Sequence, residues 1–134
     1  SEEEIMSLIS NLDLDPNDLL INSAESGFLP GVKRAIERGV DIHARDDSAL
    51  QVASLYGHYA VVALLLENGA DVHAHHDLSL RIASLYGRYG VVEILLDNGA
   101  DVHARDDWAL RYASQRGHTD VAKLLKKWME KDEG

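Results

Sequence analysis

Apolar residues recur along the chain at helical spacing, in short segments separated by glycine. In residues 59–68 and 89–98, paired valines and paired leucines fall on one face of a helix. The segments before them, 48–56 and 78–86, place small and apolar residues at the same spacing. Each segment is too short to be a stable helix alone, so the helices must gain their stability by packing against one another. The pattern therefore predicts pairs of short helices and an all-α fold.

Residues typical of helix ends bound these segments. Gly57 follows a first helix and Gly69 follows a second, as glycines do where a helix ends in the left-handed conformation. Both glycines return thirty residues later. An aspartate stands just before each first helix, where a carboxylate can accept the free N–H groups of the first turn. The residues expected to cap the first helices are Asp47, Asp77 and Asp107.

The helix pairs belong to a unit that repeats every thirty residues. The sequence GVDIHARDD at 39–47 returns as GADVHAHHD at 69–77 and as GADVHARDD at 99–107. On this period, the two central units are identical at about two-thirds of their positions. Such self-similarity is the signature of a solenoid of stacked units. The expected units are residues 16–45, 46–75, 76–105 and 106–134.

Both ends of the chain depart from the repeat in ways that predict caps. Residues 1–15 place Ile5 and Ile9 on one face of a helix whose first turn is rich in glutamate. At the other end, lysines replace the Asn-Gly-Ala-Asp exit of the earlier units, and Trp128 is positioned to close the last interface. A solenoid needs such caps because its terminal faces lack neighbours. We expect a single domain over residues 1–134, with a capping helix at 1–15.

The repeated residues resemble those of the ankyrin repeat family. The motif GADVHA, then ALRxAS, then Gly-His followed by VVxxLLxNGAD recurs in register over nearly everything after Pro16. The resemblance implies a solenoid of about four stacked helix-turn-helix units with terminal caps. The usual period is thirty-three, however, and the loop between Ala44 and Leu50 is about three residues shorter than in the family. The β-hairpin that joins units in the family is therefore an open question for this chain.

Composition and charge exclude several classes of partner. The formal net charge is −10, and the 13 Lys and Arg form no long basic block outside KLLKKWMEK, so nucleic acid is not an expected partner. No apolar run approaches the eighteen or so residues that span a bilayer. The chain has no cysteine, which is compatible with a reducing compartment. We expect a soluble, cytoplasmic-type protein without a membrane segment.

The residue types of a catalytic triad are present but follow the repeat. Ser54, His58 and Asp71 have equivalents in later units, so they track the architecture instead of marking one unique site. The histidine-rich segment DVHAHHD at 71–77 brings three histidines together, whereas structural zinc normally has four ligands in tetrahedral geometry. We expect no enzymatic activity, no metal site and no cofactor.

The clearest difference between the units lies around the turn that joins the two helices. Leu55, Tyr56 and Tyr59, which the next unit repeats, give way to Gln, Arg and Thr in the last unit. The polar set is typical of a solvated surface, so the aromatic set is hard to explain as core. Large tyrosine side chains are enriched at binding hot spots. The residues expected to bind a partner are Leu55, Tyr56, Tyr59, Ala60, Leu78, Leu85, Tyr86, Arg88, Tyr89, Gly90 and Trp108.

Three kinds of molecule would carry such a surface. An engineered ankyrin scaffold would present rewritten positions to a chosen folded protein, and the near-identity of the central units and the absence of cysteine favour this origin. A natural ankyrin adaptor would present them to a cellular protein, and irregular residues such as FLPGVKRAIERG in the first unit are compatible with it. A homodimer would bury the surface against itself. The expected function in the first two is protein binding in a hetero-complex.

Overall fold

A computed structural model describes residues 1–11 and 15–133 of the chain, and the side chains of residues 1–8 and 15–131. Within this part, the chain forms nine α-helices and no strand, so the all-α prediction is confirmed. The helices are α1 (Glu2–Asn11), α2 (Pro16–Ser26), α3 (Leu29–Glu37), α4 (Ala44–Leu55), α5 (Tyr59–Glu67), α6 (Ala74–Leu85), α7 (Tyr89–Asp97), α8 (Ala104–Gln115) and α9 (Thr119–Glu133).

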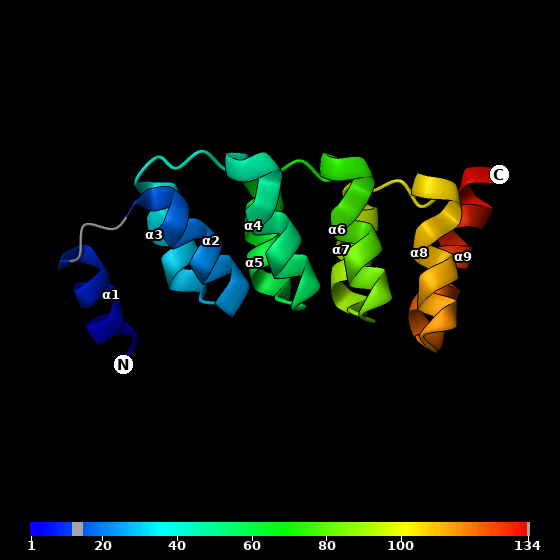
Figure 1. The fold of residues 1–134 in the computed structure, drawn as a ribbon, viewed down its shortest axis with the longest axis horizontal. Helices are drawn as coiled ribbons and strands as arrows, with labels where there is room; N and C mark the ends of the chain where they lie inside the picture. Colours follow the sequence, from blue (N-terminus) through cyan, green and yellow to red (C-terminus); the bar gives the residue numbers. More distant parts are fainter. Residues whose placement is uncertain (12–14, 134) are drawn as a thin grey trace.

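The helices stack in pairs along one axis (Figure 1). The first helices α2, α4, α6 and α8 contact one another in order, and α5, α7 and α9 form a second row behind them. The pairs follow the predicted units, so the four-unit solenoid is confirmed. The two ends of the chain lie at opposite ends of the row. Each unit therefore packs only against its neighbours, which makes the interfaces between units the core of the protein.

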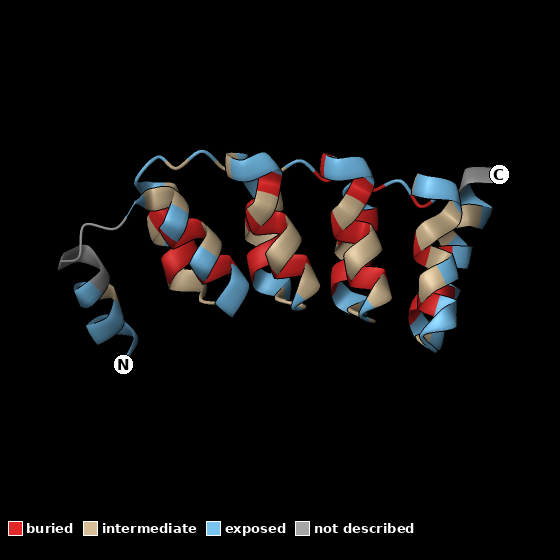
Figure 2. Ribbon diagram, in the orientation of Figure 1, coloured by how far each residue is buried: buried red, intermediate tan, exposed pale blue. Residues whose placement is uncertain are grey.

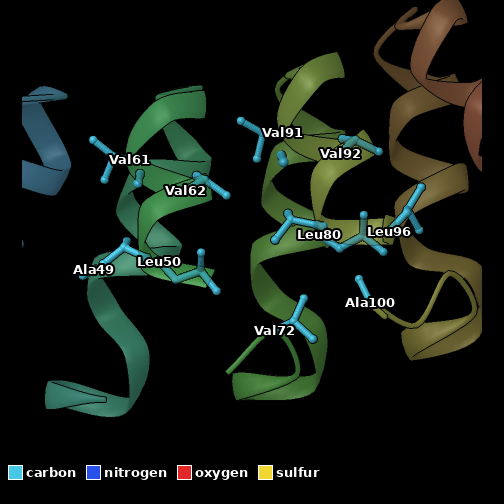
Figure 3. Close-up of a cluster of buried hydrophobic side chains, with 14 of the residues drawn as sticks. Ala49, Leu50, Val61, Val62, Val72, Leu80, Val91, Val92, Leu96 and Ala100 are labelled. Carbon is cyan, nitrogen blue, oxygen red and sulfur yellow. The ribbon is translucent and has the colours of Figure 1, made fainter. Parts of the chain in front are cut away.

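Neighbouring valines join each unit to both of its neighbours. Val61 and Val62 are both buried, and Figure 3 shows them pointing to opposite sides of α5. Val91 and Val92 repeat this arrangement on α7. Figure 2 shows that buried residues gather where the helix pairs face one another. Full burial of one such side chain contributes about 1.5–3 kcal/mol, so the valine pairs stabilise the stack on both faces of a unit.

The glycines after the helices have the predicted conformation. Gly57 has φ of 74°, and the N–H of the following His58 donates to the Ala53 carbonyl at 2.9 Å. Gly69, after α5, has φ of 90°. In this left-handed region a side chain would clash with the backbone, and glycine avoids the cost. The predicted ends of the first and the second helix of a unit are therefore confirmed.

A left-handed turn replaces the loop that the sequence left open. Arg45, Asp46 and Asp47 have φ of 53°, 60° and 62°, although none is glycine. The same turn recurs at residues 75–77 and 105–107. Figure 1 shows these turns at the upper ends of the helix pairs, where the connecting segments enter α4, α6 and α8. The described residues contain no β-hairpin here, because the shortened segment closes as one left-handed turn.

The prediction that these aspartates cap their own helices is wrong. An N-cap residue has extended backbone angles, whereas Asp47 is left-handed with φ of 62°. The Asp47 carboxylate instead accepts the backbone N–H of Asp71, in the segment that leads to the next left-handed turn, at 2.8 Å. Asp77 accepts the N–H of Asp101 at the same distance. Asp47 and Asp77 therefore connect successive left-handed turns and do not begin helices.

The two ends of the solenoid are closed to different extents. At the C-terminal end, Trp128 packs against the core, as predicted. At the N-terminal end, α1 forms where the apolar stripe predicts a helix and contacts α3. Ile5 and Leu8 on this helix nevertheless remain 47% and 57% exposed, and the side chain of Ile9 lies outside the described residues. The role of α1 as a sealing cap stays a prediction.

Candidate protein-binding surface

The tyrosines predicted to bind a partner lie at the turns between paired helices. Tyr56 directly follows α4, and Tyr59 is the first residue of α5. Tyr86 and Tyr89 hold the same places in the next unit. Figure 1 shows these turns at the lower ends of the helix pairs, opposite the left-handed turns. The repeat therefore aligns the four rings along one edge of the solenoid.

All four rings face solvent. Tyr56, Tyr59, Tyr86 and Tyr89 are 46%, 52%, 48% and 40% exposed, whereas core residues of the same helices are buried. Filling of the core therefore does not explain them, and their predicted exposure is confirmed. Two half-buried leucines accompany them. We define the tyrosine edge as Leu55, Tyr56, Tyr59, Leu85, Tyr86 and Tyr89.

Gly90 lies beneath the ring of Tyr59. A Cβ atom built at Gly90 would be 3.4 Å from Cδ2 of Tyr59, which is ordinary van der Waals contact. The ring therefore leans from one unit onto the second helix of the next. The sequence predicted that Gly90 leaves a depression for a partner, and the structure shows Tyr59 beside part of that space. Ala60, the other small residue, is exposed on α5.

Arg88 occupies the position that a histidine has in the preceding unit. His58 Nε2 lies 2.8 Å from the Glu25 carbonyl of the unit before it. Arg88 makes the equivalent contact, because its Nε donates to the Leu55 carbonyl at 3.0 Å. The guanidinium therefore joins two units at the tyrosine edge. A contact between Arg88 and a partner stays a prediction.

Two shallow grooves open between the second helices. The first lies between Tyr59 and Tyr89 and encloses about 350 Å³. The second lies between α7 and α9 and encloses about 470 Å³. We call the second one the α7–α9 groove. It is lined by Tyr89, Glu93, Asp120, Lys123, Leu124 and Lys127.

Leu78 and Trp108 are not brought together with the tyrosines. Leu78 lies next to a left-handed turn, eight residues before Tyr86, which corresponds to about 12 Å along a helix. The ring of Trp108 is 4.1 Å from that of Tyr112, and the guanidinium of Arg81 lies 5.3 Å from it. Trp108 thus has partners within the chain. Its predicted place at the rim of the binding surface stays untested.

A ladder of histidine and aspartate contacts at the left-handed turns was not foreseen. His43 Nδ1 lies 3.1 Å from the Asp47 carboxylate, and His73 Nδ1 lies 3.0 Å from Asp77. The hydrogen bond and the negative charge of Asp47 raise the pKa of His43. A signal for this ladder exists in the sequence, since a histidine precedes an aspartate by four residues in three successive units. A spacing of four residues brings two side chains together only where the backbone is helical, and in this segment the backbone forms a left-handed turn.

Long polar side chains hold the left-handed turns from the other side. Nε of Arg81 donates to the His76 carbonyl at 3.0 Å, and its Nη2 donates to the His75 carbonyl at 2.9 Å. Arg111 repeats the pair of contacts in the last unit, and Gln51 makes a single one in the second unit. The carbonyl groups that point out of a turn are thereby satisfied, which reduces the cost of the unusual backbone.

The three histidines of segment 71–77 do not converge on one point. His73 contacts Asp77 at the same left-handed turn, whereas His75 Nε2 lies 2.7 Å from Asp46 at the preceding left-handed turn. Across the described side chains, no three His, Asp or Glu residues come close enough to hold an ion. Ser54, a candidate for the triad considered above, is fully buried, so its hydroxyl is out of reach of a substrate.

Comparison with known families agrees with this architecture. The model for ankyrin repeats, in three copies, matches residues 3–76 and again residues 20–106. Comparison with curated proteins gives no significant match. No helix within residues 1–11 and 15–133 combines the length and apolar character needed to cross a membrane. Ankyrin repeats generally serve as protein–protein interaction modules and are typically not enzymes. Because the match covers more than half of its residues, the chain belongs to the ankyrin repeat family.

Proposed function

We propose that this protein is a non-enzymatic module that binds a folded protein partner through the tyrosine edge. The observation that supports the proposal is the exposure of four tyrosine rings, between 40% and 52%, at equivalent places in two adjacent units. The last unit has polar residues at those places, so the fold does not require tyrosine there. A surface of this composition is typical of binding hot spots.

The proposed mechanism is rigid display. Tyr56 and Tyr59 flank a turn whose backbone is set by the left-handed Gly57 and by the hydrogen bond from His58 N–H to the Ala53 carbonyl. Arg88 ties this turn to the following unit through the Leu55 carbonyl. The rings are therefore held on an ordered backbone before binding. Less conformational freedom is lost when the complex forms, which favours affinity.

The partner proposed is a different folded protein. The edge contains six apolar or aromatic residues and no acidic residue, while the whole chain carries a formal charge of −10. Two copies of the chain that approach through this edge would repel each other, because each carries a net negative charge. A neutral or basic partner meets no such repulsion. The binding role is proposed equally for an engineered scaffold and for a natural adaptor, because both would display the same residues.

The test compares the central units with the last one. A partner selected from a protein library on the wild-type chain is titrated against Tyr56→Ala/Tyr86→Ala and against Gln115→Ala/Arg116→Ala. The tyrosine variant is expected to lose at least about 2 kcal/mol of binding free energy, with the thermal midpoint nearly unchanged because both rings are half exposed. The matched variant of the last unit should bind as wild type. Equal affinity of all three proteins would remove the tyrosines from the interface.

The homodimer is distinguished by its mass. Light scattering across a concentration series should give the same mass for Tyr56→Ala/Tyr86→Ala as for wild type if the tyrosine edge serves a different protein. A wild-type mass that rises with concentration, and returns to one chain in the double variant, would replace the hetero-complex with self-association through this edge.

A further inference from the structure

The exposed face of α1 is both apolar and acidic. Ile5 and Leu8 are 47% and 57% exposed and lie one helical turn apart on the same face. Glu2 and Glu4 flank them on the helix surface and are exposed. Residues 2–11 contain no basic side chain. This face therefore combines exposed apolar surface with negative charge, of which Glu4 pairs with the N-terminal amine of Ser1 at 3.1 Å.

The α7–α9 groove has the complementary character. Its floor is formed by the ring of Tyr89 and by Leu124, which is 9% exposed. Lys123 and Lys127 stand on its rim, one turn apart on α9. Neither lysine has an ion-pair partner among the side chains of residues 1–8 and 15–131. With Lys126 and Lys131, residues 123–131 of α9 carry four lysines against one glutamate, in a chain whose formal charge is −10.

We propose that α1 of one copy of this protein docks in the α7–α9 groove of a second copy. Ile5 and Leu8 would cover Tyr89 and Leu124, while the glutamates of α1 would pair with the lysines of α9. Charge complementarity favours this occupant, because α1 exposes two aliphatic side chains beside three glutamates and carries no basic side chain. The contact shares Tyr89 with the tyrosine edge but uses none of its other residues.

The other charges of the groove set the direction of the docked helix. Glu93 and Asp120 also line the groove, and both would repel a glutamate. The glutamates of α1 occupy only its first turn, and the rest of the helix is uncharged. The acidic end of α1 therefore lies beside Lys127, and its uncharged end passes Asp120. A helix of ten residues is about 15 Å long, enough to cover the roughly 10 Å between Asp120 and Lys127 along α9.

The contact has to form between molecules. Figure 1 shows α1 and α9 at opposite ends of the solenoid, so α1 cannot reach the groove of its own chain. A contact between two different surfaces leaves one α1 and one groove free in each pair. Such a head-to-tail interface adds further copies unless its geometry closes a ring.

Charge reversal and mixing test the proposal. Glu2→Lys/Glu4→Lys places positive charge on α1, and Lys123→Glu/Lys127→Glu places negative charge in the groove. Each variant alone would bring like charges together, whereas an equimolar mixture restores opposite charges at both contacts. The formal charges are −6 and −14, whose mean equals the −10 of wild type. Mass is measured by sedimentation velocity from about 10 μM to about 1 mM.

The expected result is a wild-type mass that rises with concentration, a loss of at least about tenfold in association constant for each variant alone, and recovery in the mixture. Lys33→Glu/Arg116→Glu changes two exposed residues elsewhere by the same charge. This control should associate as wild type does, unlike Lys123→Glu/Lys127→Glu. Tyr56→Ala/Tyr86→Ala should associate as wild type. A wild-type chain that stays monomeric, a mixture that fails to recover, or association lost in the tyrosine variant would each overturn the proposal.

Discussion

The Asp47 carboxylate accepts the backbone N–H of Asp71 at 2.8 Å and so joins one left-handed turn to the segment that leads to the next. The His43 ring contacts the same carboxylate, and Asp77 repeats the arrangement with Asp101. Both aspartates are buried, although carboxylates are rarely buried without partners. One carboxylate thus closes its own left-handed turn and anchors the segment that leads to the next left-handed turn. The contact joins successive helix pairs at the place where the loop is shortened.

The first prediction concerns the cost of losing this carboxylate. Asp77→Ala removes a charged acceptor from a buried backbone N–H, and we expect unfolding to become easier by about 1.5–3 kcal/mol. Asp107→Ala is the matched control, because Asp107 has the same left-handed backbone and the equivalent histidine partner, His103, while its side chain is 45% exposed. Urea unfolding measures both. Equal losses of unfolding free energy in the two variants would show that the hydrogen bond from the N–H of Asp101 does not contribute to stability.

The second prediction concerns pH. Asp47 raises the pKa of His43 above its ordinary value of 6.5, first through their hydrogen bond and then through its charge. Protonated His43 therefore stabilises the fold below about pH 6.5, and this contribution is lost as the pH rises through the higher folded pKa. Urea unfolding of wild type and His43→Asn should differ more at about pH 5.5 than at about pH 8.5. An equal difference in unfolding free energy at the two pH values would show that His43 does not contribute to the pH dependence of stability.

The stacking of units was predictable because local rules and the repeat point the same way. Gly57 ends a helix wherever it occurs in this context, and the adjacent Val61 and Val62 have to face two sides when a helix lies between two neighbours. Exposure of Tyr56 was predictable for a different reason. The last unit replaces it with Arg116, and a position that accepts arginine is rarely core.

The left-handed turns were beyond these rules. Three consecutive residues with positive φ cost about 1–2 kcal/mol each for side chains other than glycine, so local preference argues against Arg45 or His75 in this conformation. The turns exist because side-chain partners offset that cost: Asp47 accepts the N–H of Asp71, 24 residues on, and Arg81 donates to the carbonyls of His75 and His76. The contact of Tyr59 with Gly90 could not be predicted from the sequence either, because it depends on the rotation of one unit relative to the next.

The third prediction concerns two buried hydroxyl groups. The Oγ atoms of Ser54 and Ser84 are buried and have no hydrogen-bond partner in the described part of the chain. A buried polar group without a partner costs about 1–3 kcal/mol, and alanine would remove the hydroxyl while leaving a small void. We expect Ser84→Ala to raise the thermal midpoint. Ser114→Ala, at the exposed equivalent position of the last unit, should leave it unchanged. A lower midpoint for Ser84→Ala would mean that its hydroxyl is satisfied in solution.

The fourth prediction separates two roles of Gly90. Glycine inside a helix costs about 1 kcal/mol relative to alanine, and Gly90 lies in the first turn of α7 without a positive φ. A Cβ there would meet Tyr59 Cδ2 at 3.4 Å, so the ring has to move little or not at all. Gly90→Ala should therefore stabilise the protein in thermal unfolding by up to that amount.

Gly87→Ala is the contrasting variant, because its consequences have the opposite sign. Gly87 has φ of 70°, and a Cβ there would lie 2.5 Å from Nδ1 of His118, so both the backbone and the packing resist a side chain. We expect Gly87→Ala to lower the midpoint clearly. If Gly90→Ala is more stable yet binds the selected partner more weakly than wild type, the small residue serves close approach by the partner. Unchanged affinity would assign Gly90 to the packing of Tyr59 alone.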